Sequence, residues 1–187
     1  MTWDAASQKR SAFSDAAHKA ARRDIYPSVL QTDPSLLSFE SVEYDESERE
    51  QVLDQDLGID RLIEVKIESL YSPIRFSSQE RFRLPQFADY QDLTVTEWHH
   101  GNDSPAELHK ILADLFVYGY YDELADKFLD AIVIPVVSLK LALIHDRVVY
   151  ERRRNDRAQS FLTIKFADLA AAKVPHWRMP RPAKQAA

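Results

Sequence analysis

The segment that most constrains this chain runs from Asp56 to Arg83 and has the pattern of a β-hairpin. Two runs rich in Ile, Val, Leu and Phe, RLIEVKI and IRFSSQERFRL, alternate with a period of two. Ser72-Pro73 lies in the short connection between them. Because paired residue numbers in a hairpin sum to a constant, a turn near Leu70 places Asp60 opposite approximately Glu80. The sequence therefore predicts an acidic residue on one strand beside a Gln-Glu-Arg triplet on the next.

The composition indicates one globular domain. The 187 residues are 45% hydrophobic and 29% charged, which is enough for a sizeable core. Cysteine is absent, which excludes disulfides, thiolate zinc sites and a cysteine nucleophile. No signal peptide is expected, because MTWDAASQKR has no apolar core, and the apolar run at 129–144 is too short to span a bilayer. We therefore expect a cytoplasmic protein without a membrane partner.

The charge is distributed unevenly along the chain. Residues 140–187 hold eleven Lys and Arg against four Asp and Glu, a net charge of +7. Since the whole chain has a net charge of −6, residues 1–139 have a net charge of −13. The densest basic group, a candidate nucleic-acid contact, consists of Arg152, Arg153, Arg154 and Arg157. Arginine–phosphate contacts give sequence-independent, salt-sensitive affinity, and Trp177 with Arg178 are candidates to stack on bases. Consecutive strand residues cannot all face one ligand, and self-neutralising surface charge is the alternative.

Further elements follow from periodicity and capping signals. Ser104, Pro105 and Glu107 form a capping box, which predicts a helix with a buried stripe running to Phe116. The other elements expected in chain order are helices at 5–24 and 47–56, strands at 92–98 and 129–137, and smaller helices and strands from 138 to 175. The strand at 129–137 is apolar on both faces, which favours a central position. A mixed central β-sheet flanked by helices is therefore expected.

Several common chemistries lack their sequence signals. The only glycines are Gly58, Gly101 and Gly119, so no glycine-rich loop can hold phosphates or a dinucleotide. No G-x-S-x-G elbow and no HExxH motif are present. Serine hydrolases of that type and zinc hydrolases are therefore disfavoured.

The order helix, three strands, helix and strand, with Asp60 on the first strand of the hairpin and Gln79-Glu80-Arg81 on the second, resembles the PD-(D/E)XK nuclease superfamily over residues 45–137. The resemblance implies an α/β, restriction-endonuclease-like core (α-β-β-β-α-β). Residues 1–35 would be an N-terminal helical extension, 138–175 basic C-terminal elements and 176–187 a tail, within a single domain. It also implies Mg²⁺ or Mn²⁺ held by acidic side chains on neighbouring strands, and a nearby basic residue that assists hydrolysis of DNA rather than RNA. Small members of this superfamily often belong to phage or mobile elements.

The resemblance assigns roles by position. Asp60 takes the place of the first acid, Gln79 that of the second acid and Arg81 that of the lysine. An amide is a weaker metal ligand than a carboxylate, and a guanidinium binds phosphate better than it activates water. Glu80 would supply a carboxylate and a metal ligand if a β-bulge turned it to the same face. Lys110 is the basic residue on the following helix that the resemblance brings toward the site.

Other interpretations of the same residues remain open. Glu64-Val65-Lys66 is a closer acid-x-Lys match, but Glu64 lies roughly 13 Å from Asp60 along one strand, too far to share an ion. Acids of the preceding segment, Glu43, Glu48 and Asp56, are further candidate ligands. The polar residues of the second strand can also be a solvated face. Separately, the missing second acid favours a nuclease-fold protein without catalysis that binds nucleic acid or assembles as a homodimer or with a protein partner.

Overall fold

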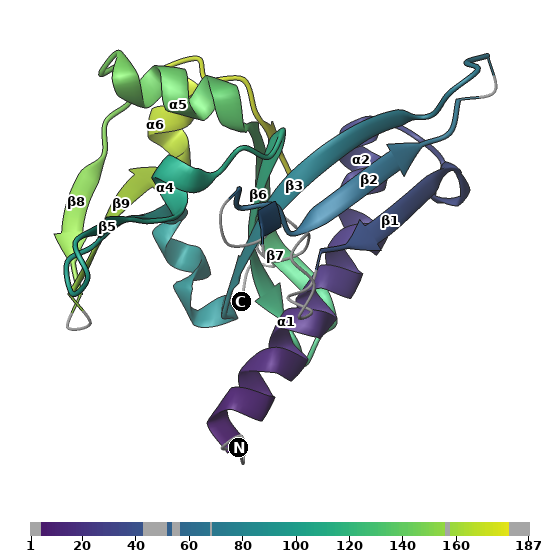
Figure 1. Ribbon diagram of the computed structural model, residues 1–187. Coiled ribbons are helices and arrows are strands. Elements are labelled where there is room, and N and C mark those ends of the chain that lie inside the picture. The colour runs from purple at the N-terminus through teal and green to yellow at the C-terminus, as the bar shows by residue number, and fades with distance from the viewer. Residues whose placement is uncertain (1–4, 43–51, 54–56, 68, 156–157, 180–187) are drawn as a thin grey trace, which may run out of the picture.

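Two β-sheets lie side by side in the computed structural model, which describes residues 5–42, 52–53, 57–67, 69–155 and 158–179 (Figure 1). The six-stranded mixed sheet has the order β1-β2-β3-β6-β7-β10. Its strands are β1 (Leu37–Ser41), β2 (Arg61–Val65), β3 (Ile74–Arg83), β6 (Leu115–Asp122), β7 (Lys127–Pro135) and β10 (Trp177–Arg178). Only β3 and β6 pair in parallel; the other neighbours are antiparallel. The expected mixed α/β architecture is confirmed.

The second sheet is four-stranded and antiparallel, with the order β5-β4-β9-β8. Its strands are β4 (Asp92–His99), β5 (Ser104–Pro105), β8 (Glu151–Arg154) and β9 (Gln159–Lys165). The helices are α1 (Ala5–Asp24), α2 (Tyr26–Leu30), α4 (Glu107–Lys110), α5 (Val136–Ile144) and α6 (Phe166–Ala171), with short 3₁₀ turns at Pro34–Leu36 and Pro85–Tyr90. None of the helices in these described ranges is long and apolar enough to cross a membrane.

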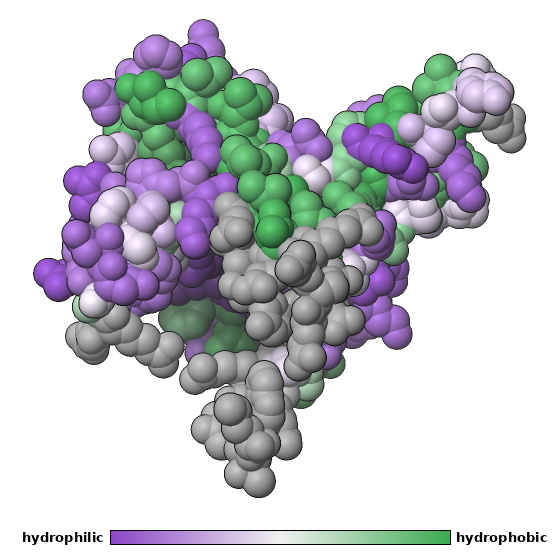
Figure 2. Space-filling view, viewed as in Figure 1, coloured by the Kyte–Doolittle hydropathy of each residue, from purple (hydrophilic) through white to green (hydrophobic). Residues whose placement is uncertain are grey.

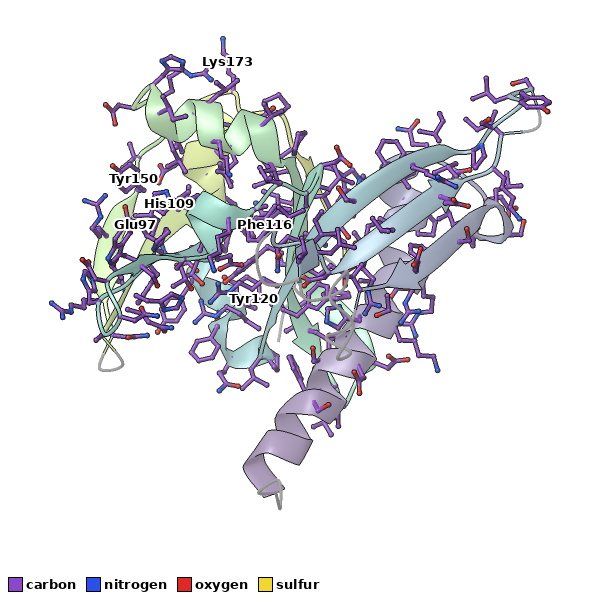
Figure 3. All side chains as sticks on the ribbon, in the orientation of Figure 1. Glu97, His109, Phe116, Tyr120, Tyr150 and Lys173 are labelled. Atoms are coloured by element: carbon purple, nitrogen blue, oxygen red, sulfur yellow. The ribbon has the colours of Figure 1, made fainter. Side chains whose placement is uncertain are left out.

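Strand β6 is the centre of the molecule because it is buried on both faces. Phe116, Tyr118 and Tyr120 pack toward the second sheet, α5 and α6, while Val117 and Tyr121 pack toward α1 and α2. Figure 3 shows Phe116 and Tyr120 inside the body of the protein. Strand residues i and i+2 share a face, so this run of aromatics fills two core layers at once.

Small side chains allow the elements to approach one another. On α1, Ala17, Ala20 and Ala21 are almost fully buried against the sheet. On β6, a Cβ at Gly119 would lie 2.8 Å from the Phe128 ring, closer than side-chain contacts normally come. A glycine is therefore needed there to accommodate the aromatic ring of β7.

The helix predicted from Ser104 to Phe116 is wrong in extent. Ser104-Pro105 forms β5, the helix α4 covers only Glu107–Lys110, and β6 begins at Leu115. Ala106 occupies the cap position without a side-chain hydrogen bond. The Glu107 carboxylate instead accepts from Thr96 N and pairs with Arg81, so tertiary partners displaced the local capping arrangement.

Other expectations have mixed outcomes. The strand predicted at 92–98 forms as β4 but belongs to the second sheet and does not lie beside the hairpin. Strand β1 was not anticipated, and Trp177–Arg178, assigned to a loose tail, forms the edge strand β10. Most of the helix predicted at 47–56 lies outside the described residues. The helix at 5–24 and the buried strand near 129–137 are confirmed.

Candidate functional site

The β2–β3 pairing brings Asp60 and Gln79 together. Arg61 pairs with Ser78, so Asp60 lies opposite Gln79, one residue from the position expected from the sequence. The Asp60 backbone N–H donates to the Ser78 carbonyl at 2.8 Å. Asp60 Oδ2 accepts from Gln79 Nε2 at 2.8 Å and from the Glu80 backbone N–H at 2.5 Å. The carboxylate is therefore held by the strand that carries the triplet.

Gly58 makes the turn that leads into this pairing. Its φ of +57° lies in the left-handed region, which glycine adopts without a Cβ penalty. A Cβ there would lie 3.1 Å from Gln79 Oε1 and 3.2 Å from Ile111 Cα. Leu112 N also donates to the Leu57 carbonyl at 2.8 Å, so the end of α4 packs on this turn. Lys110, the last residue of α4, directly precedes Ile111, which contacts this turn.

Arg81 lies on the same face of β3 as Gln79 and connects three elements. Its Nη1 pairs with the Glu107 carboxylate of α4 and donates to Thr96 Oγ1 of β4 at 3.3 Å. Thr96 N donates to the same Glu107 oxygen at 3.1 Å. The Arg81 side chain remains 34% exposed. Since a guanidinium carries five N–H donors, this geometry is compatible with a further anionic ligand.

Glu80 faces the opposite side of the sheet. Its carboxylate accepts from the Tyr26 hydroxyl, pairs with His18 Nδ1 and lies 3.4 Å from Arg61 Nε. The Tyr26 hydroxyl also lies 2.7 Å from Ser78 Oγ. Burial, and secondarily the Glu80 charge, raise the pKa of Tyr26 well above its ordinary value.

The bulge that would turn Glu80 toward Gln79 is not present. The pairing of β3 with β6 runs from Ser78 to Arg83 without a shift in register, and the pairing with β2, which ends at Ser78, has none either. Asp60, Gln79 and Glu80 therefore do not form one ligand set. Glu80 instead ties α1 and α2 to the sheet.

The remaining candidate ligands do not join this site. Glu64 forms a cross-strand ion pair with Arg75 at 2.7 Å, farther out on the hairpin, and Lys66 is exposed. Glu43, Glu48 and Asp56 lie outside the described residues. Within the described part of the chain, no three His, Asp or Glu side chains are grouped closely enough to hold a metal ion.

The three arginines of β8 are all exposed, and each has different neighbours. Arg152 forms two hydrogen bonds of 2.7 Å with Glu97, and this guanidinium lowers the pKa of Glu97. Arg153 pairs with Glu151. Arg154 follows at the end of the strand, and Arg157 lies outside the described residues. The positive charges of Arg152 and Arg153 are therefore offset by neighbouring carboxylates.

The pair proposed for base stacking has structural partners. Arg178 binds the buried Asp130 carboxylate at 2.6 and 3.1 Å, and Trp177 packs against the core beneath α1. A common hollow is lined by Glu97, Trp98 and His109, which no sequence pattern singled out. No local signal marks them, because their proximity depends on pairing between β4 and β9 and on the position of α4.

Comparison of the chain with protein-family models gives no match, and comparison with curated protein sequences gives no significant one.

Proposed function

We propose that this protein is a metal-dependent nuclease of the PD-(D/E)XK type that acts on DNA through Asp60, Gln79 and Arg81. One observation carries the proposal: Asp60 contacts Gln79 across the hairpin, and Arg81 follows two residues later on the same face. The order of elements also supports it. Helix α1 precedes the antiparallel strands β1 to β3; after β4 and β5 of the second sheet, the short helix α4 precedes β6, which runs parallel to β3.

The contact between Asp60 and Gln79 fits a divalent cation. Mg²⁺ binds oxygens at about 2.0–2.1 Å in octahedral geometry, so neighbouring ligand oxygens lie about 2.9 Å apart. Gln79 Nε2 and Asp60 Oδ2 are 2.8 Å apart. A half-turn of the amide exchanges its nitrogen and oxygen, which are assigned from hydrogen bonding. Mg²⁺ is usually bound through one or two carboxylates, substrate phosphates and several waters, so Asp60 and Gln79 would supply the protein ligands and the substrate phosphate and waters the rest.

Each residue then has a distinct role. When bound, the cation would supply Lewis-acid activation of the phosphate and of the attacking water. Asp60 and Gln79 hold it, and the main chain of Glu80 orients the Asp60 carboxylate. Arg81 binds a phosphate oxygen while Glu107 fixes the position of its guanidinium. Lys110 adds positive charge from the end of α4.

A second candidate is a nuclease-fold protein that binds nucleic acid without cleaving it. The observation that favours it is the mutual satisfaction of these side chains: Gln79 donates to Asp60, and Arg81 pairs with Glu107. Such contacts complete a polar layer between the two sheets without any ligand.

Cleavage assays on labelled single-stranded, duplex and branched DNA, with Mg²⁺, Mn²⁺ or EDTA, distinguish these candidates. Wild-type protein and an Asp89→Asn control, which alters an exposed carboxylate, should cleave only with metal. Asp60→Asn should reduce the rate by about two orders of magnitude, the effect of losing an electrostatic contact at a reacting centre.

Each other result has a defined meaning. Equal cleavage by Asp60→Asn would contradict the assigned site. Salt-sensitive binding without cleavage would favour the second candidate. If the protein neither bound nor cleaved any of the substrates, both candidate functions would be excluded.

A further inference from the structure

A β-bulge in β4 rearranges the surface of the second sheet. Thr96 pairs with Phe161 and Trp98 pairs with Ser160, so Glu97 is an extra residue on β4. Bulges change the direction of side chains that would otherwise alternate. As a result Glu97 and Trp98 line the same hollow.

The hollow extends across three strands. Ser160 pairs with Trp98 on one side and with Arg154 on the other, so these three residues form a row across β4, β9 and β8. Neighbours in such a row share a face of the sheet. The hollow has a volume of about 480 Å³, and His109 of α4 also lines it. We call this hollow the bulge pocket.

A smaller, more apolar recess adjoins the bulge pocket. It has a volume of about 290 Å³ and shares Glu97, His109 and Arg152 with it. Its apolar lining comes from Leu108, Leu143, Ile144, Tyr150 and Leu162. Figure 3 shows Glu97, His109 and Tyr150 close together on this lobe, and Figure 2 shows hydrophobic residues over α5 above hydrophilic residues of the strands. Together the two hollows reach the size range of small-ligand sites.

The chemistry of the lining favours a planar group that carries a phosphate. The Trp98 and His109 rings meet edge to face, with their centroids 5.9 Å apart and their planes at 87°, and both residues line the hollow. Glu97 and Arg152 neutralise each other, whereas Arg154 is exposed at the end of β8. Aromatic faces stack on nucleobases of any sequence, and arginine binds phosphate.

We propose that the bulge pocket binds an unpaired nucleotide of a DNA strand, with its base against Trp98 and its phosphate at Arg154. The pocket and the proposed nuclease site are connected through β4 and α4. Thr96, which contacts Arg81, is next to Glu97, and Glu107, which pairs with Arg81, is two residues before His109. This inference rests on the proposed action on nucleic acid, and it makes single-stranded or locally opened DNA the preferred substrate.

Fluorescence anisotropy with labelled single-stranded and duplex oligonucleotides tests the pocket apart from catalysis. The measurements use full-length Asp60→Asn in EDTA, at several salt concentrations. The single strand should bind more tightly than the duplex. Adding Trp98→Ala should weaken single-strand binding about ten-fold, the scale of one lost base stack, whereas Trp98→Phe should retain it.

The charge contribution has its own matched pair of variants. Arg154→Gln should lower the slope of log affinity against log salt by about one. Lys173→Gln removes the same charge from an exposed position after α6, far from the pocket in Figure 3, and should leave the slope unchanged.

Three results would overturn the inference. The first is that Trp98→Ala binds the single strand as tightly as the protein with Trp98. The second is that Trp98→Ala loses as much affinity for the duplex as for the single strand. The third is that the protein binds mononucleotides but not the strand. If the wild-type protein still cleaved DNA only with metal, any of these three results would leave the nuclease proposal intact. Strand binding that depends on Trp98, without any cleavage by the wild-type protein, would support the bulge pocket and contradict the nuclease proposal.

Discussion

At the scale of single residues, the surroundings of Gln79 and Arg81 explain how these two side chains are held in the candidate site. Gln79 fits between Gly58 and Asp60, where its amide donates to the carboxylate. Arg81 is long enough to reach Glu107 on α4 and Thr96 on β4. Both side chains therefore make contacts that a shorter or acidic side chain would not reproduce without a ligand.

Replacing Gln79 by Glu should strengthen metal binding. A carboxylate in that position adds a charged oxygen ligand beside Asp60, and Mg²⁺ prefers charged oxygen donors. We expect half-maximal cleavage at a lower Mg²⁺ concentration, together with a less stable protein in EDTA because two carboxylates then repel each other.

The measurements are cleavage rates over a Mg²⁺ titration and thermal unfolding with and without metal. Gln86→Glu, which adds the same charge at an exposed residue of the Pro85–Tyr90 turn, is the control. If Gln79→Glu and Gln86→Glu behaved alike, Gln79 would have no place in the metal site.

At the scale of elements, the hairpin and α4 are held together by the turn at Gly58. Its left-handed backbone places Asp60 opposite Gln79, and the end of α4 packs on it through Ile111 and Leu112. The hairpin itself extends beyond the body of the protein, where Tyr71 is fully exposed (Figure 1). The catalytic proposal therefore depends on the inner end of the hairpin.

Gly58→Ala should destabilise the protein by about 1–2 kcal/mol, the cost of a left-handed residue that carries a Cβ. The added Cβ would also press on Gln79 Oε1 and displace it from Asp60. Chemical denaturation measures the first effect and the cleavage rate the second. Gly101→Ala is the matched control, since a Cβ there meets nothing within 4 Å. Equal stability of the two variants would show that the turn tolerates a side chain.

At the scale of the whole molecule, two polar clusters join the layers. Arg81, Glu107 and Thr96 connect the two sheets on one side of β3. On the other side, Glu80 gathers Tyr26, His18 and Arg61 and anchors α1 and α2. A buried carboxylate is tolerated only when its hydrogen bonds are satisfied, so both helices must be docked for the sheet to be stable.

This anchoring predicts a loss of stability at alkaline pH. The pKa of Tyr26 is raised in the folded protein by burial and by Glu80, and the pKa of Tyr121 is raised to about 12, first by burial. The folded state thus retains phenolic protons that the unfolded chain releases near pH 10. The contribution to stability is fully present below pH 10 and should decline progressively above it.

Tyr26→Phe should flatten that decline, while lowering the free energy of unfolding at pH 7 by about 1–3 kcal/mol because Glu80 loses a buried donor. Denaturation curves between pH 7 and pH 11.5 provide the measurement. Tyr71→Phe, at the exposed hairpin tip, should match the wild type throughout. An alkaline decline in Tyr26→Phe as steep as that of the wild type would contradict the assignment.

Local patterns in the sequence determined a substantial part of this protein. The helix at 5–24, the hairpin and the buried strand near 129–137 follow from alternation, helix periodicity and apolar runs, which act between residues close in the chain. The contact between Asp60 and Gln79 was predictable to within one residue for the same reason, because a hairpin closes locally.

Only the tertiary structure decided which partners these elements acquire. Strand β4 joined a second sheet, the capping signal at Ser104 yielded to the pairing of Glu107 with Arg81, and Glu80 turned to Tyr26 and His18. The bulge at Glu97 likewise exists only through the pairing of β4 with β9. Which partner an element acquires depends on contacts between residues far apart in the chain. The energies of these contacts outweigh the local secondary-structure propensities, which are about a few tenths of a kcal/mol per residue.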